Sequence, residues 1–238
     1  LVGNKDVEQI TVSDLEKYIN SRLGKIKNSS INREVDNIRR IFSLAVENKR
    51  ISVNPCSTLK KLRIENPPER YLTKEEEVKL LAVCNPIMKA MTITALHTAM
   101  RTNEILSLKW QDVFFEEGYL IALNTKNNKP RKLPLTTTLK NELLNLPRLS
   151  EYVFTSSVTG TRYTEVKTTF KRAVERSGIP HITFHKLRNT AASRLNEAGV
   201  DIVTIQKILD HADLKTTLRY THNSSASIAN AFDLLNKY

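Results

Sequence analysis

Residues 184–220 carry three successive helical patterns of apolar residues. The first pattern repeats every three or four positions, at Leu187, Ala191, Leu195 and Ala198. This spacing predicts a helix that packs on a core through one stripe and ends at Gly199. Asp201 and Asp213 each precede a further apolar stripe, so we expect them to cap a second and a third helix.

Four reactive or charged side chains stand beside these stripes. His185 and Arg188 are three residues apart, so they project from the same side of the first helix. His211 directly follows the second helix. In the short third helix, Tyr220 lies off the stripe to which Leu218 belongs, which predicts a tyrosine that is free to react.

The pattern over residues 11–61 predicts a small helical unit. S-D-L-E from Ser13 is typical of a capping box, and a longer helix is expected to start at Ser29 or Ser30. A polar stripe on this longer helix consists of Arg33, Asn37 and Arg40. It fits an ordinary solvated face or a helix that presents arginine and asparagine to a DNA groove.

Composition shifts divide the chain into two predicted domains, residues 1–64 and 71–238, joined by a linker at 65–70 that contains two adjacent prolines. The end of the first domain is basic, with Lys60, Lys61 and Arg63. These residues can pair with phosphates if the connection passes beside a duplex. A generic flexible linker is the alternative.

The second domain is predicted to be mainly α-helical with a small β-hairpin. Thr73 and Glu76 form a capping box, and the helix over 87–99 is apolar on most sides. Short β-prone runs follow at 118–123 and 131–135, then helices at 136–146 and 164–176 with a brief strand at 152–154 between them. The last eighteen residues predict a tail helix from about residue 226, whose stripe consists of Ile228, Phe232 and Leu235.

The net charge of the chain indicates which kind of partner it binds. The 238 residues carry a formal net charge of +12 with a pI near 9.7, which favours an acidic polymer, although a solvated basic surface is the alternative. The longest weakly polar run, 87–100, is shorter than the roughly 20 residues of a membrane span and contains Lys89 and His97. Two distant cysteines fit thiols in a reducing cytoplasm and show no zinc-ligand spacing.

Three motifs resemble the tyrosine recombinases, the family of phage and transposon integrases. The first is H-K-L-R from His185, followed by a second histidine and by Tyr220 nine residues after it. The second is T-A-M-R-T-N-E-I-L-S-L-K-W around Arg101, and the third is the hairpin N-T-K-N-N-K-P-R-K-L-P-L. They occur in family order within residues 71–222. A lone H-x-x-R would be a weak signal, whereas the set is specific.

The resemblance implies a role for each motif residue. Arg101 and Arg188 would hold the two non-bridging phosphate oxygens, with Glu104 orienting Arg101. Tyr220 would be the nucleophile, His185 its base and His211 a further phosphate donor. Lys126 would protonate the leaving oxygen, with Lys129 and Lys132 as rivals in the same hairpin. On the predicted helix 164–176 and in the loop before it, the candidate phosphate contacts are Arg162, Lys167, Lys171 and Arg172.

The implied fold is a two-domain DNA clamp with an integrase-like catalytic domain, whose first 64 residues are the core-binding domain, short enough that a preceding helix is expected. The implied activity is site-specific strand cleavage and rejoining through a 3′-phosphotyrosine, without metal or ATP. Partners would be double-stranded recombination sites, accessory DNA-bending proteins and a homotetramer with exchanged tails. The location would be cytoplasmic, at the nucleoid. A telomere resolvase or topoisomerase-like enzyme, and a DNA-binding protein that has lost catalysis, are the rival functions.

Two positions depart from the family pattern. The family usually has glycine where this chain has Ala99, two residues before Arg101, and where it has Asp210, before His211. Aspartate tolerates left-handed backbone angles, but its carboxylate is expected to favour the charged form of His211.

Overall fold

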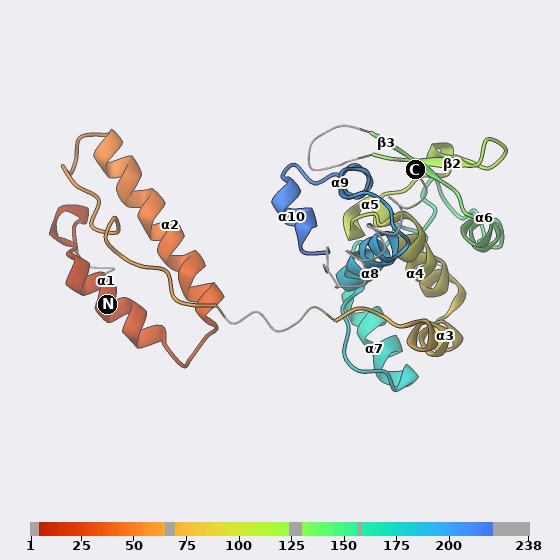
Figure 1. Cartoon of the computed structure of the whole chain (residues 1–238), viewed down its shortest axis with the longest axis horizontal. Helices are drawn as coiled ribbons and strands as arrows, with labels where there is room; N and C mark the ends of the chain where they lie inside the picture. Colours follow the sequence, from red (N-terminus) through yellow and green to blue (C-terminus); the bar gives the residue numbers. More distant parts are fainter. Residues whose placement is uncertain (1–4, 65–69, 124–129, 157–158, 221–238) are drawn as a thin grey trace, which may run out of the picture. The chain divides into compact units, whose positions relative to one another are not determined.

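The computed structural model describes residues 5–64, 70–123, 130–156 and 159–220. The chain divides into two compact units, Leu1–Pro68 and Glu69–Tyr238 (Figure 1). Lys126, Lys129 and the predicted tail helix lie outside the described residues. Among the helices within these ranges, none has the length and apolar character needed to cross a bilayer.

The N-terminal unit contains a 3₁₀ turn, Val7–Gln9, and two helices, α1 (Val12–Arg22) and α2 (Asn28–Glu47). Its core is formed by Leu15, Phe42 and Cys56. The capping box of α1 is made by Thr11 and Asp14, not by Ser13 as predicted: the Asp14 carboxylate accepts from the Thr11 amide at 3.0 Å. The prediction is wrong by two residues because Val12 already belongs to the first helical turn.

The chain after α2 returns along that helix and is fastened to it by side-chain amides. Asn32 bonds both the amide and the carbonyl of Leu62, each at 2.9 Å, and Asn28 donates to the carbonyl of Arg63 at 2.9 Å. The basic end of this unit is therefore held on α2 up to the point where the described range ends.

The second unit is built around α4 (Pro86–Thr98), which is buried along most of its length. Helices α6 (Thr137–Leu144) and α8 (Phe184–Glu197) pack on it, and α3 (Lys74–Val83) packs on α7 (Lys167–Ser177). The predicted capping box of Thr73 and Glu76 is present at the start of α3. The predicted mainly helical class is confirmed.

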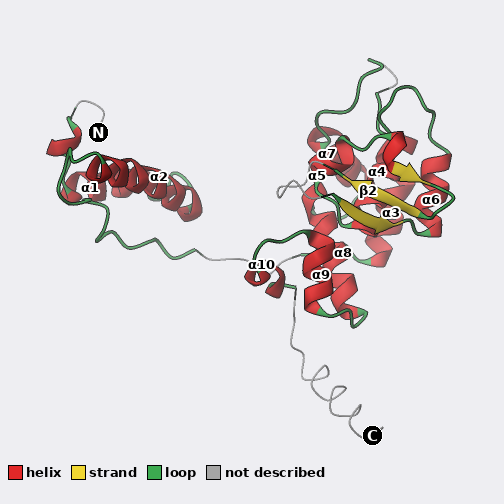
Figure 2. Ribbon diagram, turned by 90° about the horizontal axis from the view of Figure 1, so that it is seen from above, coloured by secondary structure: helices red, strands yellow, loops and turns green. Residues whose placement is uncertain are grey.

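A three-stranded antiparallel sheet lies against these helices (Figure 2). Its strands are β1 (Val113–Phe114), β2 (Tyr119–Ala122) and β3 (Arg131–Pro134), in that order. The predicted hairpin corresponds to β2 and β3, with Ala122 opposite Arg131. The pattern did not predict β1, which is two residues long. The brief strand predicted at 152–154 is reduced to isolated bridges, one of them between Lys109 and Tyr152.

Three short helices complete this unit next to α8: α5 (Thr102–Leu106), α9 (Ile202–Leu209) and α10 (Leu214–Leu218). A 3₁₀ turn spans Trp110–Asp112. The predicted caps are present, because the Asp201 carboxylate accepts from the Thr204 amide at 2.8 Å and that of Asp213 from the Lys215 amide at 2.9 Å.

Both positions where the family usually has glycine adopt left-handed backbone angles. Ala99 ends α4 with φ 54° and Asp210 ends α9 with φ 50°. This conformation costs a residue with a side chain roughly 1–2 kcal/mol, less for aspartate than for alanine. The family's glycines therefore fit a backbone requirement that this chain meets without them.

Candidate active site

Arg188 lies at the centre of the site, 2% exposed, on the first turns of α8. Its guanidinium donates to the carbonyl of Ala99 at 2.6 Å and to the carbonyl of Leu209. Burial, followed by the positive charge of Arg101, lowers the pKa of Arg188 to about 10. The side chain therefore stays cationic at neutral pH, and it joins the ends of α4 and α9.

Arg101 follows α4 and is held by two carboxylates. Its Nη1 donates to Glu104 at 2.9 Å and to Asp210 at 2.8 Å, and its Nη2 donates to the carbonyl of Asp210 at 2.6 Å. Burial acts to lower the pKa of Arg101, but the hydrogen bonds to Asp210 and Glu104 outweigh it and raise the pKa. The predicted contact of Glu104 with Arg101 is present, and Asp210 adds a second one.

A third arginine, Arg131, belongs to the same cluster and was not predicted. It opens β3 and donates to Glu104 at 2.6 Å and to the carbonyl of Ile208. Its position in a basic hairpin gave no sequence signal, because Lys129 and Lys132 flank it with the same charge. Only the packing of β3 against α9 separates Arg131 from its neighbours.

Both predicted histidines are held as neutral bases. His185 is exposed at the surface, and partial desolvation together with the positive charges of Arg188 and Lys186 lowers its pKa. Burial and the nearby arginines lower the pKa of His211 to about 4, and its Nδ1 lies 2.9 Å from the hydroxyl of Thr217. The Asp210 carboxylate acts in the expected direction and raises the pKa of His211, but desolvation and the arginines outweigh it.

Tyr220 does not lie on an open face, as the helical pattern predicted. It is 2% exposed, its ring centroid is 6.4 Å from that of His211, and its hydroxyl donates to the Asn189 side chain at 3.0 Å. Leu218, assigned to the apolar stripe, is instead 46% exposed. The prediction that Tyr220 belongs to the third helix is wrong, because α10 ends at Leu218 and Tyr220 lies in the turn that follows it. Asn189, like Arg131, is a site residue that the sequence did not indicate.

A pocket of about 300 Å³ between α7 and α8 brings predicted DNA contacts next to the candidate base. Lys167, Lys171 and His185 all line it, together with Thr102 of α5. Lys171 also lies 3.7 Å from Glu175, an exposed ion pair of small energetic effect. Two of the predicted phosphate contacts thus share one surface with the candidate active site.

The remaining predicted contacts in this unit are also exposed. Arg172 lies on α7, and the guanidinium of Arg162 sits 5.5 Å from the ring centroid of Tyr152. Lys132, the described rival of Lys126, has its ammonium 3.7 Å from the ring centroid of Tyr119. The Lys132 ammonium thus lies over the Tyr119 ring in a cation–π contact and is not part of the arginine cluster.

In the N-terminal unit the predicted stripe of Arg33, Asn37 and Arg40 is exposed along α2. Arg40 forms a long ion pair with Glu47, at 3.5 Å, whereas Lys61 bonds Asp36 at 2.7 Å. Lys60 and Arg63 are exposed. The Asp36 carboxylate thus offsets part of the positive charge predicted for the basic segment.

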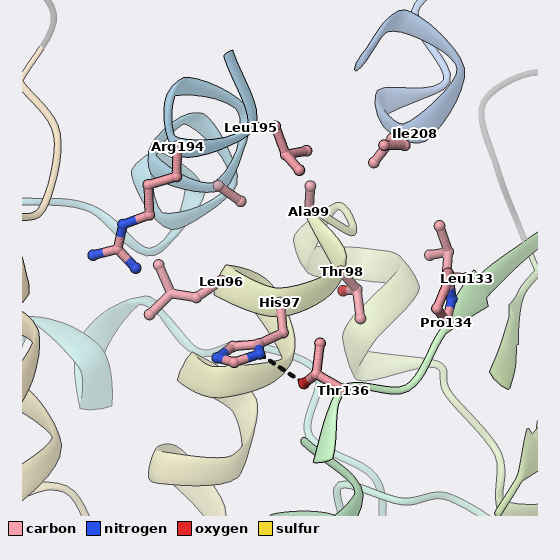
Figure 3. A pocket seen from close by; sticks show the side chains of 11 residues that line it. Leu96, His97, Thr98, Ala99, Leu133, Pro134, Thr136, Arg194, Leu195 and Ile208 are labelled. Carbon is pink, nitrogen blue, oxygen red and sulfur yellow. Dashed lines mark hydrogen bonds between the residues drawn. The ribbon is translucent and has the colours of Figure 1, made fainter. Parts of the chain in front are cut away.

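A second pocket, of about 340 Å³, lies between α4, β3, α8 and α9 and is mostly apolar (Figure 3). Leu133, Leu195 and Ile208 line it from β3, α8 and α9. At its floor, His97 Nδ1 is 2.7 Å from the hydroxyl of Thr136. In the described part of the chain, no group of three or more His, Cys, Asp or Glu side chains is placed to hold a metal ion.

Known DNA recombinases and integrases are similar to this chain. The model of the phage integrase family matches residues 70–227. The shufflon-specific DNA recombinase of Escherichia coli is 29% identical over 98% of this chain, and the integrase of Escherichia phage P2 is 29% identical over 95%. The chain spans 63% and 65% of the length of these two relatives.

Solved structures share the fold. The Tn1549 transposon integrase in complex with a circular intermediate DNA superimposes with a TM-score of 0.83 at 20% identity, over 95% of this chain and 86% of that one. A lambda integrase tetramer bound to a Holliday junction gives 0.75 at 22% identity, over 87% and 66%. With the family model matching most of its length, the chain belongs to the phage integrase family of tyrosine recombinases.

Proposed function

We propose that the chain is a site-specific DNA recombinase that cleaves and rejoins strands through a covalent 3′-phosphotyrosine. The observation that carries the proposal is the convergence of Arg101, Arg188, His211 and Tyr220 around the end of α9, with His185 on adjoining α8. Two guanidiniums, two neutral imidazoles and a phenol are the groups that a phosphodiester transfer needs. The family membership and the names of the relatives support the same chemistry.

In the proposed reaction, Arg101 and Arg188 bind the non-bridging oxygens of the scissile phosphate. Guanidinium groups suit this task because they donate in a planar fork and stay charged. The transition state carries more negative charge than the ground state, so fixed cations lower the barrier. His211 donates a further hydrogen bond to a phosphate oxygen, which requires the tautomer with the proton on Nε2 when Nδ1 accepts from Thr217.

The covalent step exchanges one phosphate ester for another. The Tyr220 oxygen forms a bond to phosphorus while the bond from phosphorus to the 5′-oxygen breaks. His185 takes the phenol proton, for which its lowered pKa keeps it neutral at pH 7. Lys126 gives a proton to the 5′-oxygen. Because the phosphotyrosine conserves the energy of the broken ester, the reverse attack by a 5′-hydroxyl rejoins a strand without ATP.

The proposed partners are duplex recombination sites and three further copies of the chain. The N-terminal unit would clamp the DNA with Arg33, Asn37 and Arg40, together with the basic segment at 60–63. The lambda integrase tetramer on a Holliday junction supports an assembly of this kind. The apolar stripe of the predicted tail would fill the 340 Å³ pocket of a neighbouring copy. Accessory DNA-bending proteins and a location at the nucleoid complete the proposal.

The test is covalent trapping on a nicked duplex, from which the short 5′-hydroxyl fragment diffuses away after cleavage. We expect a protein–DNA band that survives denaturation and disappears after protease treatment. The assay uses the full chain. Because the target sequence must also be identified, the nicked duplexes are made from genomic DNA fragments that the protein captures. DNA binding without any covalent band would instead indicate a DNA-binding protein without catalysis.

A further inference from the structure

The end of α9 is held by three arginines rather than two. The last carbonyls of a helix have no partner within it and carry the negative end of the helix dipole. Here each of three consecutive carbonyls accepts from a different arginine. The pairs are Ile208 with Arg131, Leu209 with Arg188, and Asp210 with Arg101. Arg131 thus makes the same contact as the two arginines to which the proposed reaction assigns the phosphate.

Arg131 and Arg101 also share one carboxylate. Glu104 is buried, with a side chain 2% exposed, and its Oε2 lies 2.6 Å from Arg131 Nη2 and 2.9 Å from the Arg101 amide. Its Oε1 lies 2.9 Å from Arg101 Nη1. A buried carboxylate that lost one of two cationic partners would turn toward the other. The orientation of the Arg101 guanidinium therefore depends on Arg131.

Charge gives Arg131 a second effect. The cluster holds the guanidiniums of Arg101, Arg131 and Arg188 and the carboxylates of Glu104 and Asp210, so its net charge is +1. Removing Arg131 would bring that charge to zero at the place where the phosphate must bind. At 10% side-chain exposure, Arg131 is shielded from water, which strengthens its electrostatic effect.

We propose that Arg131 is a positioning residue for strand cleavage, which orients Arg101 through Glu104 and holds the end of α9 against β3. It also keeps the phosphate site net positive. Arg131 itself need not touch the DNA. The inference rests on the proposed recombinase reaction, and it adds to the site a residue of β3.

A matched control is available in the same unit. Arg176 on α7 also donates to the backbone carbonyl of another element, that of Val83 at 2.9 Å, and it lies outside the cluster and outside both pockets described above. Arg176→Gln therefore reports the cost of losing an arginine that joins two elements away from the site. Arg131→Gln keeps an N–H donor for the carbonyl of Ile208 and removes the positive charge. Arg131→Lys keeps the positive charge and loses the planar pair of guanidinium donors.

The experiment measures single-turnover cleavage of a nicked duplex, the Kd for the intact duplex and the Tm of each variant. Arg131→Gln is expected to slow cleavage about 10- to 100-fold. Arg131→Lys is expected to recover at least half of that loss on a logarithmic scale. The Kd of both variants for DNA should stay within about twofold of that of the unmodified chain. Arg176→Gln should cleave within about threefold of it. A second arm replaces the scissile phosphate by methylphosphonate, whose transition state is less charged, so the defect of Arg131→Gln should shrink several-fold there.

Two results would overturn the inference. One is a loss in Arg131→Gln no larger than that in Arg176→Gln at equal Tm. The other is a loss that Arg131→Lys does not recover and that is equal on phosphate and methylphosphonate. If Arg131→Gln does not fold, the rate of Arg131→Lys against Arg176→Lys decides in the same way. Absence of any covalent product from the unmodified chain would contradict the recombinase proposal itself, which makes the two failures distinguishable.

Discussion

The phenol hydroxyl of Tyr220 donates a hydrogen bond to the side-chain oxygen of Asn189, 3.0 Å away and 31 residues earlier in the chain. The ring packs with Ala99, Ala192 and Leu209 in a small core beside Arg188. The hydroxyl of the proposed nucleophile thus has a hydrogen-bond partner within the chain. Attack on a phosphate requires this hydrogen bond to be exchanged for one to the base.

Replacing Tyr220 by phenylalanine should abolish covalent protein–DNA adducts and leave the Kd for DNA within about twofold, because only the nucleophilic oxygen is removed. The variant should also lose about 1 kcal/mol of unfolding free energy, since the oxygen of Asn189 loses its donor. Denaturing gels and urea unfolding measure the two effects. Tyr163→Phe is the control. An adduct that persists in Tyr220→Phe would assign the nucleophile to another tyrosine, Tyr163 or Tyr238.

Local signals predicted the framework of the site well. The caps at Asp201 and Asp213 act within three residues, so the sequence placed the starts of α9 and α10 correctly, although α10 ends before Tyr220. The hairpin of β2 and β3 was equally local. Each of these elements is set by residues that are neighbours in the chain.

Contacts between distant segments were not predictable in this way. Tyr220 lies two residues beyond α10, and whether it faces solvent or Asn189 depends on a contact between segments 31 residues apart, which no local pattern decides. Arg131 stands among lysines of equal charge, and only the approach of β3 to α9 selects it. The burial that lowers the pKa of His211 has the same origin.

Asp210→Asn tests how the negative charge of Asp210 affects the arginine cluster. Asparagine accepts the same left-handed backbone and can still bond Arg101, but the cluster gains one net positive charge. We expect cleavage to be about 3- to 10-fold faster at low salt, with a smaller gain at high salt because of screening. Asp213→Asn, an exposed cap, is the control. Slower cleavage would instead mean that the Asp210 charge is needed to orient Arg101.

The lowered pKa of His211 predicts a specific pH dependence of stability. In the unfolded chain a histidine titrates near pH 6.5, whereas His211 in the folded chain titrates at about 4. Between these values the unfolded state binds the extra proton, so the unfolding free energy falls as the pH is lowered from about 6.5 toward 4.

His211→Asn keeps a polar group near Thr217 and removes the titration. Urea unfolding at pH 7, 6 and 5 should show a shallower decline for this variant, by at most about 1.4 kcal/mol per pH unit, since one proton is involved. His181→Asn, which changes an exposed histidine, should keep the decline of the unmodified chain. Parallel declines in His211→Asn and the unmodified chain would contradict a neutral, desolvated His211.

The last prediction concerns the tail, whose stripe of Ile228, Phe232 and Leu235 is too short to form a stable helix in water by itself. The pocket lined by Leu133, Leu195 and Ile208 is mostly apolar and has a volume of about 340 Å³ (Figure 3). Docking within one molecule is favoured by effective concentration, whereas docking on a neighbour would couple one active site to the next.

Docking on a neighbour predicts that two different changes have the same effect. Deletion from Ser227 onward and the substitution Leu195→Glu, which places a charge in the pocket, should both weaken the DNA-bound tetramer in sedimentation and alter cleavage. Binding of the monomer to DNA should survive in both, and the Tm of the deletion variant should stay close to that of the full chain, because the monomer does not use its own tail. A lowered Tm with unchanged sedimentation of the assembly would show that the tail packs on its own molecule.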